Sequence, residues 1–253
     1  MKVKGKVAVI TGATGGIGYQ VAKRLGQDGY TVVLNGIEDE AGAKRVEELL
    51  SEGITAEYYG FDVTNDEAVT SNITAIGEKY GRIDVLVNNA GGLGGRSRFE
   101  DMTTEFYRFV MALNLDSAFF TSRAAIPYLK KGENASIINY TSIAGWNAGG
   151  PGAGIYGTSK AGVHALTRAL AKDLAEYGIR VNAVSPGTID TPFHAQIKST
   201  KPEVFESWKN NILLGKLGQP EEVASVISFL VSDDASFLTA ETIQITGGQG
   251  LGI

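Results

Sequence analysis

A serine, a tyrosine and a lysine close together in the sequence are the side chains best suited to chemistry. They are Ser142, Tyr156 and Lys160. The tyrosine and the lysine are four residues apart, so on a helix they project from one face. A phenol titrates at about pH 10 and is a poor base at neutral pH, but a nearby ammonium group lowers its pKa. With Ser142 hydrogen-bonding a substrate oxygen, the set suits proton transfer to or from a carbonyl or alcohol oxygen.

The segments around these residues predict a strand, a loop and a helix. Residues 135–141 are apolar and β-rich, which predicts a buried strand with Ser142 just past its carboxyl end. A Gly-rich loop follows over 145–154, and a helix is predicted from Tyr156 to about Tyr177. Taken alone, a Tyr-x-x-x-Lys pair is common on protein surfaces, so its weight comes from the motifs that precede it.

A glycine-rich turn near the start of the chain predicts a phosphate site. A short strand over 6–11 runs directly into Gly12-Ala13-Thr14-Gly15-Gly16-Ile17-Gly18, and a helix is predicted over 17–28. Glycines let backbone N–H groups approach a pyrophosphate, and the helix N-terminus favours its negative charge. The spacing differs from the commonest dinucleotide fingerprint, and a plain glycine-rich turn is the alternative. The flanking strand and helix favour phosphate binding.

The end of the second predicted strand bears on the choice of dinucleotide. In dinucleotide-binding α/β folds an acidic residue there usually binds the adenosine ribose. Here the strand over 31–35 ends in Asn35-Gly36. Glu38, Asp39 and Glu40 follow, with no Arg or Lys to hold a 2′-phosphate. This composition favours NAD(H) as the cofactor, and NADP(H) is not excluded.

Two further strand ends carry polar or small residues. The third predicted strand, 56–61, is followed by Asp62-Val63. Asp62 is suited either to accept a hydrogen bond from an adenine amine or to cap the helix predicted over 66–80. The fourth predicted strand, 83–87, runs into Asn88-Asn89-Ala90-Gly91. Small and amide residues there let a cofactor lie close and supply hydrogen bonds.

Asn114 lies among apolar residues inside a helix predicted over 104–129. A polar side chain in such surroundings usually has a buried partner. Two interpretations are compatible with the pattern: the amide holds a water near Lys160, or it satisfies a local kink of the backbone.

The composition narrows the classes of function. The chain has 253 residues, enough for one large α/β domain, and its net charge of −5 argues against nucleic acid or an anionic membrane as a partner. It has no cysteine and only two histidines, His164 and His194, so no metal site is predicted. We expect a cytoplasmic protein, because no signal-peptide pattern or long apolar run stands out.

Two other features predict a lid and an assembly. The segment over about 190–217 is long and polar, as is typical of active-site lids. The helices predicted over 104–129 and 156–177 carry apolar residues on more than one face, including Phe119 on the first and Ala161, Ala165 and Ala169 on the second. We expect both helices to pack against a second subunit.

Taken in order, these motifs make the chain similar to the short-chain dehydrogenase/reductase family over nearly its whole length. The matching residues are Thr11-Gly12-x-x-x-Gly16-x-Gly18, Asp62, Asn88-Asn89-Ala90-Gly91, Asn114, Ser142, Tyr156-x-x-x-Lys160 and Pro186-Gly187. The resemblance implies a single-domain, doubly wound Rossmann fold over 1–253, with a seven-stranded parallel sheet and helices on both faces. It also implies an NAD(P)-dependent oxidoreductase that forms a homotetramer.

The resemblance further implies a role for each matching residue. Ser142 would orient the substrate oxygen, Tyr156 would donate or accept the proton, and Lys160 would lower the phenol pKa and hold the nicotinamide ribose. Asn114 would anchor the water of a proton relay, and Ile189 and Thr191 would meet the carboxamide. The full cofactor set is Gly12, Thr14, Gly16, Ile17, Gly18, Asn35, Gly36, Asp62, Val63, Asn89, Ala90, Gly91, Tyr156, Lys160, Pro186, Gly187, Ile189 and Thr191.

The chain departs from the family pattern at two places. Ser142 and Tyr156 are one residue further apart than the commonest family spacing, so the loop between them carries an insertion. Gly36 stands where the family usually has an acidic residue. The sequence around Gly36, Leu34-Asn35-Gly36-Ile37, is similar to that of NAD-linked members such as 3-hydroxybutyrate dehydrogenases.

Two loops bear on the substrate. Arg96 follows the fourth predicted strand, and Trp146 and Asn147 lie between Ser142 and Tyr156, so all three are expected to border the pocket. The guanidinium fork of Arg matches a carboxylate, and an amide beside an aromatic ring suits a polyol. The Gly-Gly-x-x-Gly-Arg and Gly-Gly-Pro-Gly runs of these loops are also similar to those of sugar-acid and uronate-derived keto-acid reductases. This resemblance implies a small oxo or hydroxy acid as the substrate, namely a sugar acid or a uronate-derived keto acid of carbohydrate metabolism.

Three alternatives remain open at this point. Arg96 is also compatible with a plain cation on a surface loop. The nearest competing function is that of a 3-oxoacyl-carrier-protein reductase, and a more distant one is a non-catalytic dinucleotide-binding regulator.

Overall fold

A seven-stranded parallel sheet forms the centre of the molecule, with the strand order β3-β2-β1-β4-β5-β6-β7. The computed structural model describes residues 5–251, and for Phe193 and Gln196 the backbone only. The strands are β1 (Val7–Ile10), β2 (Thr31–Gly36), β3 (Ala56–Gly60), β4 (Val85–Asn88), β5 (Ser136–Tyr140), β6 (Arg180–Pro186) and β7 (Thr242–Ile245). The order reverses between β1 and β4, so the fold is doubly wound, as predicted.

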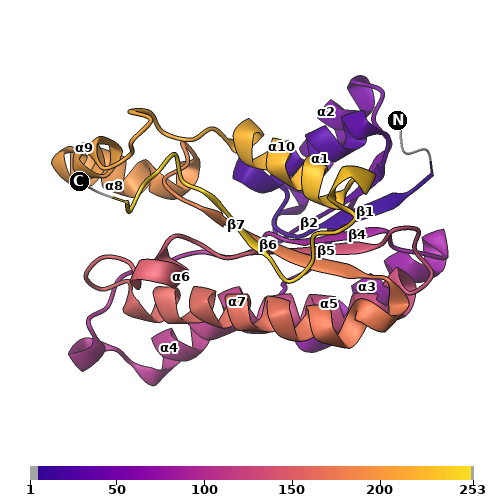
Figure 1. Cartoon of the computed structure of the whole chain (residues 1–253), viewed down its shortest axis with the longest axis horizontal. Helices are drawn as coiled ribbons and strands as arrows, with labels where there is room; N and C mark the ends of the chain where they lie inside the picture. Colours follow the sequence, from indigo (N-terminus) through magenta and orange to yellow (C-terminus); the bar gives the residue numbers. More distant parts are fainter. Residues whose placement is uncertain (1–4, 252–253) are drawn as a thin grey trace.

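Helices cover both faces of the sheet, as Figure 1 shows, with α1, α2 and α10 above it and α3, α5 and α7 below. The helices are α1 (Gly16–Asp28), α2 (Asp39–Ser51), α3 (Asp66–Tyr80), α4 (Thr104–Met111), α5 (Ser117–Leu129), α6 (Ala144–Asn147), α7 (Gly154–Leu174), α8 (Ala195–Thr200), α9 (Pro202–Asn210) and α10 (Pro220–Val231). The helices α1 and α3 begin and end within two residues of their predicted bounds.

Local signals fix several of these bounds. The Asn65 side chain accepts a hydrogen bond from the Ala68 amide and so caps α3, which ends at left-handed Gly81. At α10, Gln219 and Glu222 form a capping box around Pro220. Left-handed Gly29, with φ of 107°, ends α1.

Two apolar cores form because successive strand residues face opposite sides of the sheet. In β1, Ala8 and Ile10 belong to the core under α1 and α10, whereas Val7 and Val9 belong to the core over α3, α5 and α7. Strands buried on both faces read as continuous apolar runs, which is why the sequence showed no alternation.

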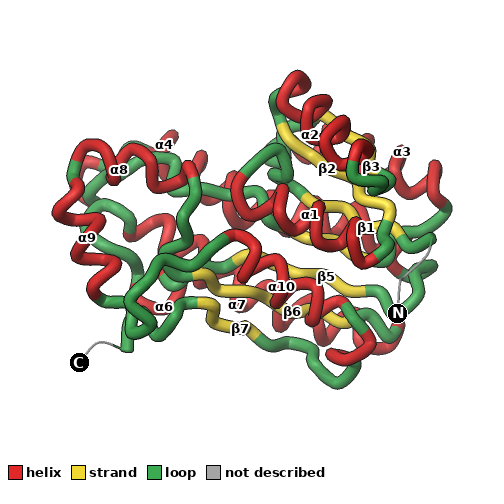
Figure 2. Tube along the Cα trace, turned by 90° about the horizontal axis from the view of Figure 1, so that it is seen from above, coloured by secondary structure: helices red, strands yellow, loops and turns green. Residues whose placement is uncertain are grey.

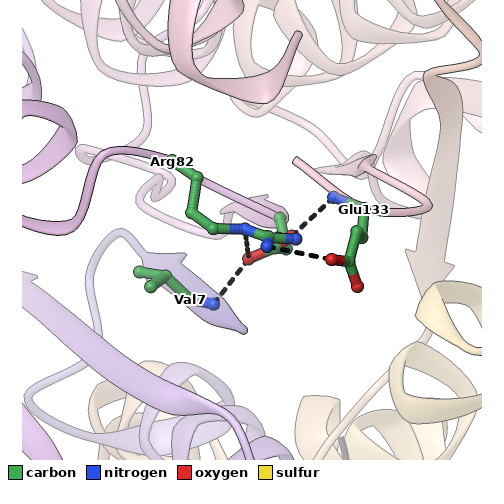
Figure 3. Close-up of polar contacts among 4 residues, drawn as sticks. Val7, Arg82 and Glu133 are labelled. Carbon is green, nitrogen blue, oxygen red and sulfur yellow. Dashed lines mark hydrogen bonds and ion pairs between the residues drawn. The ribbon is translucent and has the colours of Figure 1, made fainter. Parts of the chain in front are cut away.

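A buried carboxylate fastens the edge of the sheet where the parallel strands begin. Asp84, 1% exposed, accepts hydrogen bonds from the backbone amides of Val7 and Glu133, each at 2.8 Å. Arg82 pairs with the same carboxylate and reaches the Glu133 side chain, as Figure 3 shows. The contacts join β1, β4 and the turn before β5. They lie at the amino ends of the strands, and the predicted site lies at the carboxyl ends.

Three segments differ from the predicted elements. The loop predicted over 145–154 begins with the short helix α6. The helix predicted over 104–129 is interrupted by a π-helical turn, Ala112–Asp116, between α4 and α5. The weakly periodic segment predicted as a lid contains the short helices α8 and α9, which lie together outside the sheet in Figure 2. Their short amphipathic pattern, interrupted at Pro202, was too brief to be recognised as helical.

Candidate functional site

The glycine loop between β1 and α1 has the backbone expected of a phosphate cradle. Gly12 and Gly16 have left-handed φ angles of 62° and 53°, which other residues rarely adopt. A Cβ on Gly12 would lie 2.9 Å from the Cα of Ala90, and one on Gly15 would meet open space. No side chain caps the N-terminus of α1. The loop thus turns backbone N–H groups and a helix N-terminus toward space that an anion fits.

The residues after β4 support this loop from beneath. Asn89 donates to the carbonyls of Thr11 and Gly12, at 2.8 and 2.9 Å. In return the Thr11 hydroxyl accepts from the amides of Asn89 and Ala90. Asn89 belongs to the predicted cofactor set, and in the structure its amide group holds the glycine loop in shape.

The residues at the end of β2 contact β3 and the glycine loop. Asn35, 1% exposed, donates to the Phe61 carbonyl at 2.9 Å, so it ties β2 to β3. A Cβ on Gly36 would come within 2.5 Å of the Thr14 side chain, so the two residues pack closely. Arg45, on α2, donates to the Thr14 carbonyl at 3.0 Å and was not singled out from the sequence.

At the end of β3 the structure settles one of two interpretations. The Asp62 carboxylate accepts from the amide and the hydroxyl of Thr64, each at 2.8 Å, while Asn65 caps α3. Asp62 is therefore not the helix cap. It is exposed at the carboxyl edge of the sheet, and Val63 beside it is buried in the core.

Ser142, Tyr156 and Lys160 come together at the carboxyl end of β5. Ser142 follows this strand and its hydroxyl hydrogen-bonds the phenol of Tyr156, near the start of α7. Lys160, one turn further along α7, is 3% exposed, and its Nζ donates to the Tyr140 carbonyl at 3.0 Å. The same Nζ lies 5.8 Å from the centre of the Tyr156 ring.

The environment shifts the pKa values of both titratable groups. Burial raises the pKa of the Tyr156 phenol, and the Ser142 hydrogen bond lowers it by a smaller amount. Burial lowers the pKa of Lys160 to about 8. Ser142 is therefore a side chain that lowers the phenol pKa in this structure, and the same effect of Lys160 stays a prediction. The phenol is protonated at neutral pH and is poised to act as an acid.

Asn114 lies at the π-helical turn and faces the same centre. Its amide exchanges hydrogen bonds with the backbone of Gly92, at 2.9 and 2.8 Å, and donates to the Val110 carbonyl. A Cβ on Gly91 would lie 2.8 Å from Asn114 Oδ1 and 2.9 Å from Lys160 Nζ. The kink interpretation of Asn114 is therefore correct for its side chain, and π turns are frequent at functional sites.

A buried polar network below these residues was missed in the sequence. Asn139 in β5 accepts from Asn88 in β4 at 2.8 Å and donates to Thr167 in α7 at 3.0 Å. Thr121 in α5 donates to Asn88 at 2.6 Å. All four side chains are at most 4% exposed. The signal was a polar residue inside an apolar strand, and the network fixes β4, β5, α5 and α7 relative to one another.

The loop after β6 closes the site on the other side. The Pro186 carbonyl accepts from the Ile143 amide at 3.0 Å, which joins this loop to the segment that carries Ser142. Thr191 is the neighbour that a Cβ on Gly16 would meet, at 4.0 Å. The predicted pyrophosphate and carboxamide loops therefore face each other.

The three predicted substrate residues occupy different places. Arg96 is exposed and bridges the two loops expected at the pocket by donating to the Pro151 carbonyl at 3.0 Å. Asn147 accepts from the Gly149 amide and shapes its own loop. Trp146 donates to Ser185 at 3.1 Å, and its ring lies 4.5 Å from that of His164.

Comparisons with known proteins agree with this site. The family model described as enoyl-(acyl carrier protein) reductase matches residues 12–249. A 3-oxoacyl-[acyl-carrier-protein] reductase from Thermotoga maritima is 40% identical and a cyclopentanol dehydrogenase from Comamonas sp. is 37% identical, each over 98% of this chain and at least 98% of its own. The crystal structure of an NADH-dependent reductase, A1-R′, responsible for alginate metabolism superposes with a TM-score of 0.88 at 35% identity, covering 98% of both chains.

The chain therefore belongs to the short-chain dehydrogenase/reductase family, as its motifs predicted. It is an oxidoreductase that uses a nicotinamide cofactor and acts on alcohol or keto groups. The glycine loop and the close approach at Gly91 fit such a cofactor.

The described residues, 5–251, also bear on metal ions and membranes as partners. No group of three or more His, Cys, Asp and Glu side chains in this part of the chain has the arrangement of a metal site. No helix in the same range has the length and apolar character needed to cross a membrane.

Proposed function

We propose that this enzyme catalyses reversible hydride transfer between NAD(H) and the keto or hydroxyl carbon of a small oxo or hydroxy acid, namely a sugar acid. When bound, the nicotinamide supplies or accepts the hydride. The observation that carries the proposal is the convergence of Ser142, Tyr156 and Lys160 next to a phosphate cradle. Asn114 and Gly91 complete the wall of this site.

The proton chemistry follows from the phenol. In the reductive direction Tyr156 donates its proton to the substrate oxygen, and the Ser142 hydroxyl donates a hydrogen bond to the same oxygen. The raised pKa of Tyr156 keeps it protonated for this step. Lys160 is positioned to hold the nicotinamide ribose, and the Asn114 side chain fixes the loop at Gly92 that borders it.

Arg96 supports an acidic substrate. Its side chain bridges the loop after β4 and the loop between Ser142 and Tyr156, and this bond engages one of the five guanidinium N–H donors. The donors that remain match a carboxylate in a fork geometry. The alginate-linked reductase among the similar structures points toward the same substrate class.

The test compares Arg96→Ala with Arg98→Ala, a matched loss of an exposed Arg two residues away. Turnover is followed by NADH absorbance with a panel of oxo-acids and their neutral ketone analogues. We expect Arg96→Ala to raise KM for the acids by roughly 10- to 100-fold, which is the effect of losing a charge-assisted hydrogen bond. The KM for the neutral analogues is expected to stay unchanged. An unchanged KM for acids contradicts the role of Arg96.

A second candidate is reduction of 3-oxoacyl thioesters on acyl carrier protein. It is favoured by the Thermotoga maritima relative of that name, whose 40% identity gives it at least as much support as the sugar acid has. Acetoacetyl thioesters, carried on acyl carrier protein or on a short pantetheine-like thiol, join the same panel. Preference for the protein-bound thioester over every free oxo-acid selects this second function.

The preference for NAD(H) is argued from the adenosine end. Glu38, Asp39 and Glu40 are exposed where a 2′-phosphate would approach, and Thr14 fills the space beside Gly36. We expect kcat/KM to be higher with NADH than with NADPH. Equal or higher efficiency with NADPH overturns this part of the proposal and leaves the reaction class intact.

A further inference from the structure

Gln249 makes a two-point contact with the loop that follows β6. Its Oε1 accepts from the Thr188 amide at 2.8 Å, and its Nε2 donates to the Thr188 hydroxyl at 2.9 Å. Thr188 is 7% exposed, and 61 residues separate the two in the chain. Such a bidentate contact fixes both the position and the orientation of the loop backbone.

The turn after β7 is built to return Gln249 to this place. Gly247 and Gly248 have left-handed φ angles of 60° and 82°, and the Gln249 amide donates to the Thr246 carbonyl at 3.1 Å. A Cβ on Gly187 would lie 2.6 Å from Gln249 Oε1. The glycine of the Pro186-Gly187 motif is therefore needed to make room for the Gln249 side chain.

The same loop forms the base of the segment that contains α8 and α9. Ile189 pairs with Gly218 in an isolated parallel bridge. The Gly218 amide donates to the Thr188 carbonyl at 3.1 Å, and the Asp190 amide donates to the Gly218 carbonyl at 2.8 Å. Both ends of the 191–217 segment thus meet at the residues that Gln249 holds.

From this geometry we propose that Gln249 is a positioning residue that shapes the 186–191 loop for the nicotinamide end of the cofactor. The inference rests on the proposed function and on the family resemblance, which implies that Ile189 and Thr191 meet the carboxamide of a bound nicotinamide. Gln249 acts through Thr188 and does not touch the reacting atoms.

The proposal makes a ligand-specific prediction. Gln249→Met keeps the size of the side chain and removes both hydrogen bonds. Losing them is expected to weaken NADH binding by roughly 5- to 30-fold, the range that corresponds to about one or two hydrogen bonds. ADP-ribose carries the adenosine and pyrophosphate but lacks the nicotinamide, so its affinity is expected to change by less than about twofold. Calorimetry with both ligands measures the two dissociation constants without any turnover.

Companion variants separate positioning from general damage. Gln249→Glu retains an oxygen acceptor for Thr188 and is expected to restore most of the NADH affinity. Thr188→Val removes the hydroxyl partner alone, and its effect is expected to be non-additive with that of Gln249→Met. Gln244→Met, the same change at an exposed site on β7, serves as the matched control and is expected to bind both ligands as the wild type does.

The outcomes are distinct. If Gln249→Met weakens ADP-ribose as much as NADH, or weakens neither, the positioning role is wrong. If Gln249→Met does not fold, Thr188→Val decides by the same ratio of the NADH and ADP-ribose affinities. If Gln249→Met weakens NADH binding selectively, as expected, but the wild type reduces none of the proposed substrates, the proposed substrate is wrong and this inference stands. Faster amide hydrogen exchange over 187–190 in cofactor-free Gln249→Met provides an independent readout.

Discussion

At the scale of single residues, the site holds a protonated phenol beside a buried ammonium. Tyr156 and Ser142 share a hydrogen bond, and Lys160 is held by the Tyr140 carbonyl with almost no exposure to solvent. Such desolvation is costly for the charged form of lysine, and its effect on the pKa is the usual mark of a functional position.

Removal of the phenol is expected to abolish proton transfer and leave cofactor binding in place. Tyr156→Phe loses on the order of 10²- to 10⁴-fold in kcat, the range for removal of a general acid. Steady-state turnover and NADH titration measure the two effects separately. Tyr177→Phe, at an exposed tyrosine beyond the end of α7, is the control. Full turnover by Tyr156→Phe would refute the assignment.

Lys160 also makes stability depend on pH in a direction that can be worked out. Its pKa is about 8 in the fold and about 10.4 in an unfolded chain. Burial of the ammonium therefore opposes folding below pH 8, and this penalty is relieved as pH rises from 8 toward 10.4. The wild type thus gains stability over this window from this one group.

Lys160→Met lacks this pH-dependent term. We compare the free energy of unfolding of the variant minus that of the wild type. This difference is expected to be highest near pH 7 and to fall by on the order of 2 to 3 kcal/mol toward pH 10, because the wild type gains stability over that range. Loss of the hydrogen bond to the Tyr140 carbonyl lowers the stability of the variant by an amount that does not change with pH. Urea titrations at several pH values measure the difference, with Lys172→Met, at an exposed lysine of the same helix, for comparison. A difference that stays constant with pH contradicts the burial argument.

At the scale of elements, the sequence predicted most accurately where a local signal was strong. The bounds of α3 were correct to the residue, because Asn65 caps it and Gly81 ends it. The π turn at Asn114 was not predicted, since it depends on contacts with Gly92, which is remote in the chain. The bond of Arg45 to Thr14 and that of Gln249 to Thr188 leave no local trace for the same reason.

The Asp84 contacts in Figure 3 offer a test of element-level stability. Asp84→Asn removes a buried charge that contacts the Val7 amide, the Glu133 amide and the Arg82 guanidinium, and we expect it to lower the free energy of unfolding by about 3 to 5 kcal/mol. Chemical denaturation measures this loss. Turnover per folded molecule is expected to be unchanged, because Asp84 lies at the sheet edge opposite the site. Glu206→Gln, in an exposed ion pair with Lys209, should cost less than about 1 kcal/mol. An equal loss in both variants would refute the argument.

At the scale of the whole molecule, an apolar surface remains uncovered along two helices. Phe119 on α5 is 42% exposed, and Ala161, Ala165 and Ala169 form an exposed stripe of small residues on α7. Exposed apolar surface of this kind marks an interface. The homotetramer stays a prediction, and these two helices are where we expect its subunits to meet.

Light scattering is expected to give about four times the chain mass of 26.8 kDa. Ala165→Arg places a long charged side chain in the small-residue stripe and is expected to shift the mass to a smaller species. Ala43→Arg makes the same change at an exposed position on α2 and is expected to leave the mass unaltered. A wild-type monomer at micromolar concentration would contradict the prediction.

The central position of β1 also has a consequence for synthesis. Ala8 pairs with Val32 on one side and with Val85 on the other, so the ribosome must add more than fifty residues after the first partner before the second one emerges. During this interval the nascent chain presents an unpaired, wholly apolar strand edge. Chaperone capture of the growing polypeptide is therefore expected to be strongest before residue 85 leaves the exit tunnel, and to decline once β4 docks.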